Sequence, residues 1–284
     1  MVEPADEEYI LRHAKVPEHV PALMAGIARA DVFLTGPFVC LAKGDGLIFI
    51  GYPLEGEFSD DAFSSALDKA MARIRPSRTW FIAPDIPTSL VQRLTSREDD
   101  FYYRLDLQSP DISPRMVRIA GKAAQMLTVD ASRLFSDDHV RLTDAFLQRQ
   151  KLPPRVHQLY LCMKDYLLFS ETSLLLSARD LQGRLSAYYI LESGAREFLA
   201  YIVGCHSEES PVSHASDLLF YEMVQTARRL RKGYIHLGLG VNEGIARFKK
   251  KWGGFPFLRY AFGEIGPPAE GKFRSWMEAL ASHL

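Results

Sequence analysis

The sequence predicts a mixed α+β protein organised in two domains. In the first hundred residues, two apolar runs flank a Gly/Asp tetrad at 43–46, which is typical of a tight hairpin turn. Between residues 172 and 203, three apolar runs separated by short turns predict an antiparallel meander. The segment 109–114 contains two prolines among small polar residues and is the best candidate for a linker between the two regions. A length of 284 residues also favours two domains over one.

The first region is predicted to contain a hairpin, one helix and two further strands. The hairpin strands are 38–41 and 47–52. Ser59 and the two aspartates after it are typical of a helix start, and apolar residues then recur at helical spacing until Pro76 ends the helix. The further strands are predicted at 79–83 and 101–107.

The second region is predicted to begin with helices and to continue with strands. The predicted helices are 115–125, 137–151, 154–169, a long amphipathic helix after Pro211, and 244–252. The predicted strands are 126–130, 172–178, 185–191, 198–203, 234–239 and 256–262.

Composition and charge exclude several classes of protein. The net charge of −1 does not suggest a DNA-binding protein, and the three cysteines are too widely spaced for a zinc site or a disulfide framework. No apolar run is long enough to cross a membrane and the N-terminus is acidic, so a cytoplasmic location is expected. Residues 1–68 hold 4 Lys and Arg against 12 Asp and Glu, whereas residues 223–260 hold 9 against 1. This asymmetry suggests an anionic partner near the C-terminal third.

The order of elements after residue 113 resembles the GNAT acyltransferase fold. The most specific part is YIHLGLG at 234–240 followed by GIARFKKKWGG at 244–254, which resembles the strand and helix of the bacterial-type Fem aminoacyltransferases and lysyl-lipid synthases. The resemblance implies two GNAT-like domains, each a mostly antiparallel sheet flanked by helices. Residues 1–110 would be a reduced first copy and residues 113–284 the acyltransferase domain.

The resemblance also implies the reaction, in which an acyl or aminoacyl group moves from an anionic donor onto an amine. The donor would be an acyl-CoA or an aminoacyl-tRNA, and no metal is implied. Enzymes of this fold that use acyl-CoA usually carry a glycine-rich loop after the third meander strand. Here that position reads GCHSEESP at 204–211, and the literal match RIAGKA at 118–123 lies in the first helix of the second region. Acetyl-CoA is therefore expected to bind weakly or not at all.

Three residues near the loop after the third meander strand are candidate catalytic groups. His206, Glu208 and His214 would lie at the edge of the active cleft, where a histidine of near-neutral pKa can accept the proton of the amine. The alternative is that the histidines are exposed loop residues.

Four further residues are candidate substrate-binding groups. Lys249 occupies the lysine of the Phe-Lys motif, and the resemblance implies a cation that faces the phosphate of the donor or the developing negative charge. The alternative is a solvated basic helix end, which we favour for the two lysines that follow it. Gly240 and Asn242 lie at the turn between the motif strand and helix, and Tyr188 lies on the middle meander strand.

The sequence is also compatible with two other functions: a CoA-dependent N-acyltransferase with an unusual loop, and a binding or scaffold protein that lacks catalysis.

Overall fold

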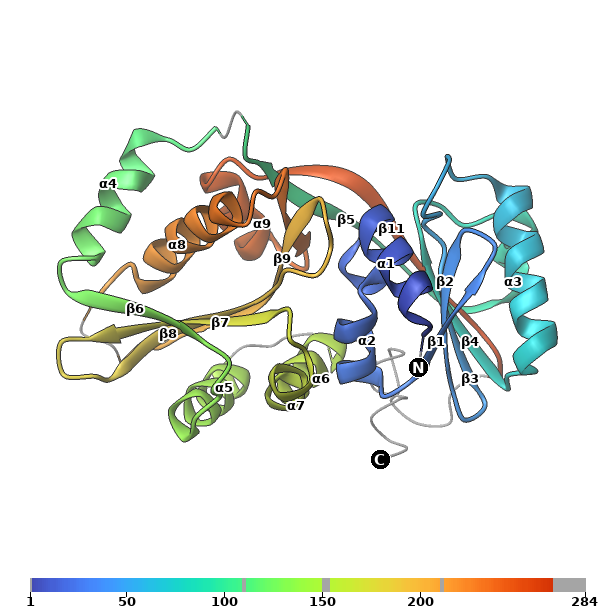
Figure 1. The fold of residues 1–284 in the computed structure, drawn as a ribbon, viewed down its shortest axis with the longest axis horizontal. Coiled ribbons are helices and arrows are strands. Elements are labelled where there is room, and N and C mark those ends of the chain that lie inside the picture. Colours follow the sequence, from blue (N-terminus) through green and yellow to red (C-terminus); the bar gives the residue numbers. More distant parts are fainter. Residues whose placement is uncertain (1, 109–110, 150–153, 210–211, 268–284) are drawn as a thin grey trace.

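The computed structural model describes residues 2–108, 111–149, 154–209 and 212–267. These residues form one sheet of eleven strands in the order β1-β2-β3-β4-β11-β5-β10-β9-β8-β7-β6, flanked by helices (Figure 1). Most neighbouring strands are antiparallel, which confirms the predicted α+β class. Some residues of the predicted elements and their boundaries lie outside the described part of the chain: Ser109, Pro110, Lys151 and Pro211. In the described part, no helix is long and apolar enough to cross a membrane.

The predicted hairpin and helix of the first region are present. This region contains β1 Asp31–Thr35, β2 Phe38–Lys43, β3 Gly46–Ile50, α3 Asp60–Ile74, β4 Arg78–Ala83 and the 3₁₀ helix η2 Thr88–Arg93. The backbone N–H of Ala62 donates to the Ser59 side chain, as expected for the residue that caps α3. Because β3 and β4 are parallel, α3 crosses over one face of the sheet between them.

Three short helices precede the first strand and were not anticipated from the sequence. They are α1 Pro4–His13, the 3₁₀ helix η1 Pro17–His19 and α2 Pro21–Ala28. Each begins with a proline, whose fixed φ and missing N–H suit the first position of a helix. This N-terminal segment lies between the two halves of the molecule, and α2 packs against α7 (Figure 1).

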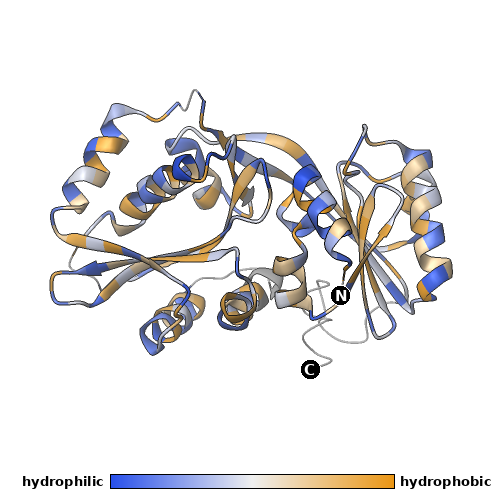
Figure 2. Ribbon diagram, in the orientation of Figure 1, coloured by the Kyte–Doolittle hydropathy of each residue, from blue (hydrophilic) through white to orange (hydrophobic). Residues whose placement is uncertain are grey.

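The second region contains the predicted meander, with helices on both of its faces. Its first elements are α4 Pro114–Ala123, β6 Leu127–Ser132, α5 Asp137–Arg149, α6 Pro154–Leu161, α7 Met163–Phe169, β7 Ser173–Asp180, β8 Leu185–Glu192, β9 Phe198–His206 and α8 Ala215–Arg229. The pairs β7–β8 and β8–β9 are antiparallel. Helices α4 and α8 cover one face and α5 to α7 the other (Figure 1). Figure 2 shows hydrophobic residues along the strands, as a sheet covered on two sides requires.

The strands at the centre of the sheet join the two regions. They are β5 Leu94–Asp106, β10 Tyr234–Leu239 and β11 Phe255–Ile265, and α9 Glu243–Lys251 lies between the last two in sequence. β5 pairs with β10 on one side and with β11 on the other, while β11 also pairs with β4. The sheet is thus continuous across the predicted linker. β5 begins seven residues earlier than expected, in a stretch rich in charged residues that periodicity does not mark as a strand.

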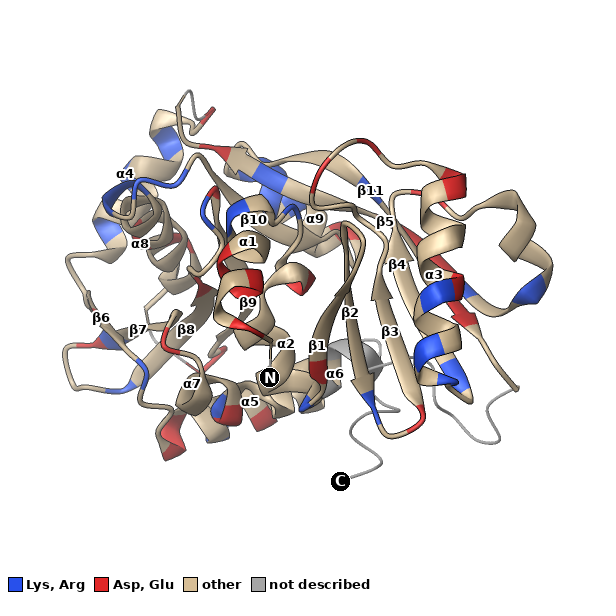
Figure 3. Cartoon of the chain, turned by 45° about the vertical axis from the view of Figure 1, so that its right-hand side comes forward, with Lys and Arg blue, Asp and Glu red and all other residues tan. Residues whose placement is uncertain are grey.

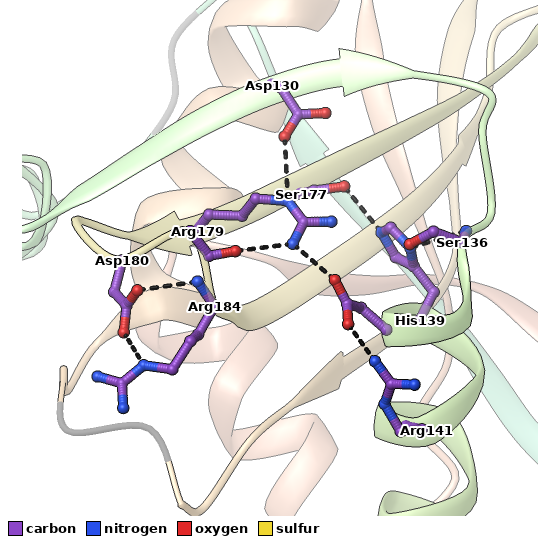
Figure 4. Close-up of polar contacts among 10 residues, drawn as sticks. Asp130, Ser136, His139, Arg141, Ser177, Arg179, Asp180 and Arg184 are labelled. Atoms are coloured by element: carbon purple, nitrogen blue, oxygen red, sulfur yellow. Dashed lines mark hydrogen bonds and ion pairs between the residues drawn. The ribbon is translucent and has the colours of Figure 1, made fainter.

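A polar cluster below the meander fixes α5 to β7, and none of its residues lines the cavity described below (Figure 4). Arg179 of β7 contacts Asp138 at 3.1 Å and Asp130 at 3.9 Å. His139 is buried, with Nδ1 at 2.8 Å from Ser136 Oγ and Nε2 at 3.0 Å from Ser177 Oγ. Burial lowers the pKa of His139 to about 4, so the imidazole is neutral at pH 7.

This histidine should make the protein sensitive to mild acid. The unfolded chain binds a proton at His139 near pH 6.5, whereas the folded protein binds it only near pH 4. The neutral His139 therefore contributes its full stabilisation above pH 6.5, and this contribution is lost as the pH falls towards 4. The free energy of unfolding, measured with urea, should fall between pH 7 and pH 5. This fall should be about 1–2 kcal/mol smaller in His139→Gln than in the original protein. An identical loss in both proteins would show that His139 does not contribute.

Candidate functional site

A cavity of about 870 Å³ opens where β9 and β10 diverge. The two strands are parallel and pair only from Tyr234–Phe198 to His236–Ala200. Beyond this point β10 has a register shift against β5, and Gly238 adopts a φ of +72°, a conformation that glycine tolerates best. The cavity is enclosed by β9, β10, the start of α8, helix α9 and the N-terminal segment. Its wall is mostly apolar and aromatic, which is typical of a small-molecule site.

Lys249 is the central charged group of this cavity. Its side chain is only 4% exposed, and Nζ donates to the carbonyl oxygen of Leu239 and lies 5.6 Å from the ring centroid of Tyr103. Burial lowers the pKa of Lys249 to about 7, although the charge of Asp100 opposes part of this shift. The alternative of a solvated helix end is therefore wrong for Lys249. Lys250 on the same helix is exposed, as a solvated helix end requires.

The turn before α9 fixes the position of Lys249. Asn242 is exposed at the cavity mouth, and its side chain caps α9 by accepting from the backbone N–H of Ile245 at 2.9 Å. Gly240 is not among the cavity residues. A Cβ at Gly240 would lie 2.8 Å from Asp100 Oδ1, and Asp100 Oδ2 accepts from the backbone N–H of Val241 at 3.0 Å. Gly240 thus allows the carboxylate to hold the turn.

The three candidate catalytic residues all line the rim of the cavity. Glu208 is 58% exposed and lies 3.6 Å from Arg149, whose guanidinium also donates to the backbone carbonyl of His206. His214 is half-exposed at the start of α8, and its Nδ1 lies 2.9 Å from Asp217 Oδ2. His206 and Glu208 thus face solvent, whereas His214 is oriented by a buried carboxylate.

Asp217 is the carboxylate that the sequence did not single out for the site. Burial alone would raise the pKa of Asp217, but hydrogen bonds from Lys251, His214 and Trp252 hold it below its ordinary value. Lys251 Nζ lies 2.6 Å from Asp217 Oδ1, so this lysine, though partly exposed, is engaged in an ion pair. Only the fold brings these residues of α8 and α9 together.

Tyr188 is placed away from the cavity. Its side chain is fully buried in the core and is not part of the cavity lining; its hydroxyl contacts Thr143 and accepts from Cys205 Sγ at 3.3 Å. Instead, Tyr102 of β5, Tyr260 of β11 and Glu18 of η1 line the cavity. No sequence pattern groups these residues, because nothing local connects a glutamate near the N-terminus with the centre of the sheet.

Much of the basic charge in residues 223–260 is engaged within the protein. Lys232 Nζ donates to the carbonyl of Ser193 at 2.7 Å, and Arg259 lies 3.0 Å from Asp85. Figure 3 shows the remaining Lys and Arg concentrated on α9 and near the end of α8, with Asp and Glu along α1.

Among the described residues, no group of three or more His, Cys, Asp or Glu side chains is arranged to hold a metal ion.

Comparison with solved structures identifies the fold. The C-terminal domain of a putative lysylphosphatidylglycerol synthetase from Agrobacterium fabrum matches with a TM-score of 0.59 at 13% identity, covering 99% of this chain and 96% of that one. FemX matches with a TM-score of 0.67 at 11% identity, covering 92% and 96%. A tandem GNAT protein from the clavulanic acid biosynthesis pathway matches with a TM-score of 0.52 at 11% identity, covering 88% and 89%.

These similarities confirm the predicted GNAT-like fold of the Fem type. No protein-family model and no curated protein matches the sequence. At identities of this size, the similarity is one of fold.

Proposed function

We propose that this protein transfers an acyl or aminoacyl group onto an amine in the cavity between β9 and β10. The observation that carries the proposal is Lys249, a buried lysine with a pKa of about 7 beside the point where the strands diverge. Lysines are almost never fully buried without a reason, and a strongly shifted pKa within a cleft is typical of a functional group.

In the proposed reaction, the amine attacks the carbonyl carbon of the donor and negative charge develops on the carbonyl oxygen. Lys249 stabilises this oxyanion. The carbonyl then re-forms as the C–O bond to the tRNA ribose, or the C–S bond to CoA, breaks, and the released oxygen or sulfur takes up the proton that the amine nitrogen loses. Charging Lys249 is costly in the empty cavity, but becomes favourable when the anion forms beside it, so the interaction is strongest in the transition state. Exposed Arg247 and Lys250 on the same helix are available to the anionic part of a donor such as aminoacyl-tRNA.

Acetyl-CoA should bind weakly or not at all. In this fold the pyrophosphate of CoA meets a helix start after the third meander strand. Here α8 begins beyond a loop that carries Glu208 and Glu209, and Asp217 occupies its first turn. Carboxylates at this helix end repel a pyrophosphate. Titration calorimetry should therefore detect no binding tighter than millimolar, and micromolar affinity would favour the CoA-dependent alternative.

A direct assay tests the proposed function. The protein is incubated with a primary amine and, in separate reactions, with aminoacyl-tRNA, acyl-CoA or no donor, and the amide product is measured by mass spectrometry. Thermal unfolding with each donor detects binding without turnover, because a ligand of the native state raises the melting temperature. Product formation with aminoacyl-tRNA supports the proposal. Binding of a donor without any product would favour a binding protein that lacks catalysis.

A further inference from the structure

Glu18, a half-buried residue of the N-terminal segment, brings a carboxylate with one buried oxygen, Oε2, to the cavity. It lies in η1, between α1 and α2, and lines the cavity together with Tyr102 and Tyr260. The Tyr102 ring packs edge-on against Tyr260 at 5.4 Å and against His236 at 4.8 Å, measured between ring centroids. Glu18 therefore shares this part of the cavity wall with aromatic side chains from the centre of the sheet.

Three polar atoms of this cluster lack a partner at normal hydrogen-bond geometry, although the Tyr102 hydroxyl faces the Glu18 carboxylate closely enough to lower the pKa of Glu18. Four buried side-chain nitrogen or oxygen atoms of the described residues lack a hydrogen-bond partner, and three of them are Glu18 Oε2, Tyr102 Oη and His236 Nε2. Burial raises the pKa of Glu18 to about 6, while its own backbone N–H and Tyr102 oppose part of the rise. An unsatisfied buried polar group costs about 1–3 kcal/mol, so the two oxygens in this cluster that can accept a hydrogen bond, Glu18 Oε2 and Tyr102 Oη, require an explanation.

We propose that Glu18 and Tyr102 bind the amino group of a primary amine that has an apolar body. An ammonium group has N–H donors for both Glu18 Oε2 and Tyr102 Oη, and a cation is attracted to the face of a tyrosine ring. The residues that follow Glu18 supply the apolar surface, since Leu23, Met24 and Ile27 of α2 also line the cavity. One short segment thus provides both the anion and the hydrophobic wall.

The amine site lies close to Lys249. His236 connects them, because its ring packs on Tyr102 and because burial, and to a smaller extent the charge of Lys249, lowers the pKa of His236 to about 3. Gly238 donates its backbone N–H to His236 Nδ1 at 3.2 Å, which places the proton of the neutral ring on Nε2. If the proposed function holds, the ammonium bound here is the acyl acceptor; it first gives a proton to the Glu18 carboxylate, and the neutral amine then attacks the carbonyl carbon of the donor in the same cavity as Lys249.

Binding of two probes of equal shape tests the amine site without a donor. The probes are 2-phenylethylamine and 2-phenylethanol, and their affinities are measured by saturation-transfer NMR and calorimetry at pH 7.5. The protein should bind the amine at least about tenfold more tightly than the alcohol, as expected for a charge-assisted hydrogen bond. In Glu18→Gln, which keeps the size of the side chain, the two probes should bind within about twofold of each other. Tyr102→Phe should weaken amine binding by a smaller factor, about threefold to tenfold.

The matched control is Glu8→Gln, the same substitution at an exposed carboxylate of α1, in the same N-terminal segment but not in the lining of the cavity. It should keep the preference for the amine. Circular dichroism and the melting temperature show that each variant is folded. Equal binding of both probes by the original protein, or a preference that survives in Glu18→Gln, would overturn the amine site.

The outcomes also separate this site from the proposed function. A Glu18-dependent preference for the amine, without amide formation from any donor, would support the amine site and count against the transferase. Amide formation with an unchanged KM for the amine in Glu18→Gln would support the transferase and overturn the amine site.

Discussion

Lys249→Met should slow acyl transfer by about 100-fold to 1,000-fold, the usual effect of removing one group that stabilises an oxyanion. Methionine matches the apolar stem of lysine up to Cε and lacks only the terminal amine, so the cavity keeps most of its shape. The loss should appear in kcat under saturating donor and amine, because the interaction is made with the transition state. Single-turnover measurements of amide formation provide the test.

The same substitution should stabilise the fold at pH 7. The amine of Lys249 binds a proton near pH 10.5 in the unfolded chain but only near pH 7 in the folded protein. The charge therefore opposes folding at and below pH 7, and stability rises as the pH increases from 7 to 10.5. Methionine removes this cost but leaves the carbonyl of Leu239 without its donor. A net gain of about 1–3 kcal/mol is expected in denaturant unfolding at pH 7, and it should shrink towards pH 10.5.

The control for Lys249 is Lys250→Met, on the same helix but exposed. It should change the free energy of unfolding by no more than about 0.5 kcal/mol and leave transfer nearly intact. Lys251 is unsuitable because its ion pair with Asp217 would be lost. Equal transfer rates in the Lys249 and Lys250 variants would remove Lys249 from the reaction, whatever their stabilities.

The elements that local patterns predict are those with one buried face. The hairpin around 43–46 has its turn residues in sequence, and α3 has both a cap and an amphipathic stripe. Helix α2 has neither signal. Five of its eight residues are buried, because it lies between the halves of the molecule and contacts protein on several sides. A short helix that is buried on several sides has no separate apolar and polar faces, so its sequence lacks the helical periodicity of hydrophobic residues.

The site was predictable only where its residues are close together in sequence. Lys249 was found through the motif around it, although the adjacent Lys250 and Lys251 gave no sign that it alone would be buried. The partners Glu18 and Tyr102 are more than eighty residues apart, and they meet because η1 is placed over the central strands. Such contacts depend on topology, which composition and spacing do not determine.

Trp252→Ala should destabilise the protein by about 3–5 kcal/mol, the range found for removing a large buried aromatic side chain. Trp252 is fully buried and stacks on Phe220 of α8, with ring centroids 4.7 Å apart, and its Nε1 donates to Asp217 Oδ1 at 3.0 Å. The substitution leaves a cavity beneath α9 and takes one donor from a buried carboxylate. Trp252→Phe retains most of the packing and loses only this donor, so it should cost less than half as much. Urea unfolding compares the two variants; equal losses would mean that the hydrogen bond to Asp217, and not the stacking on Phe220, joins α9 to α8.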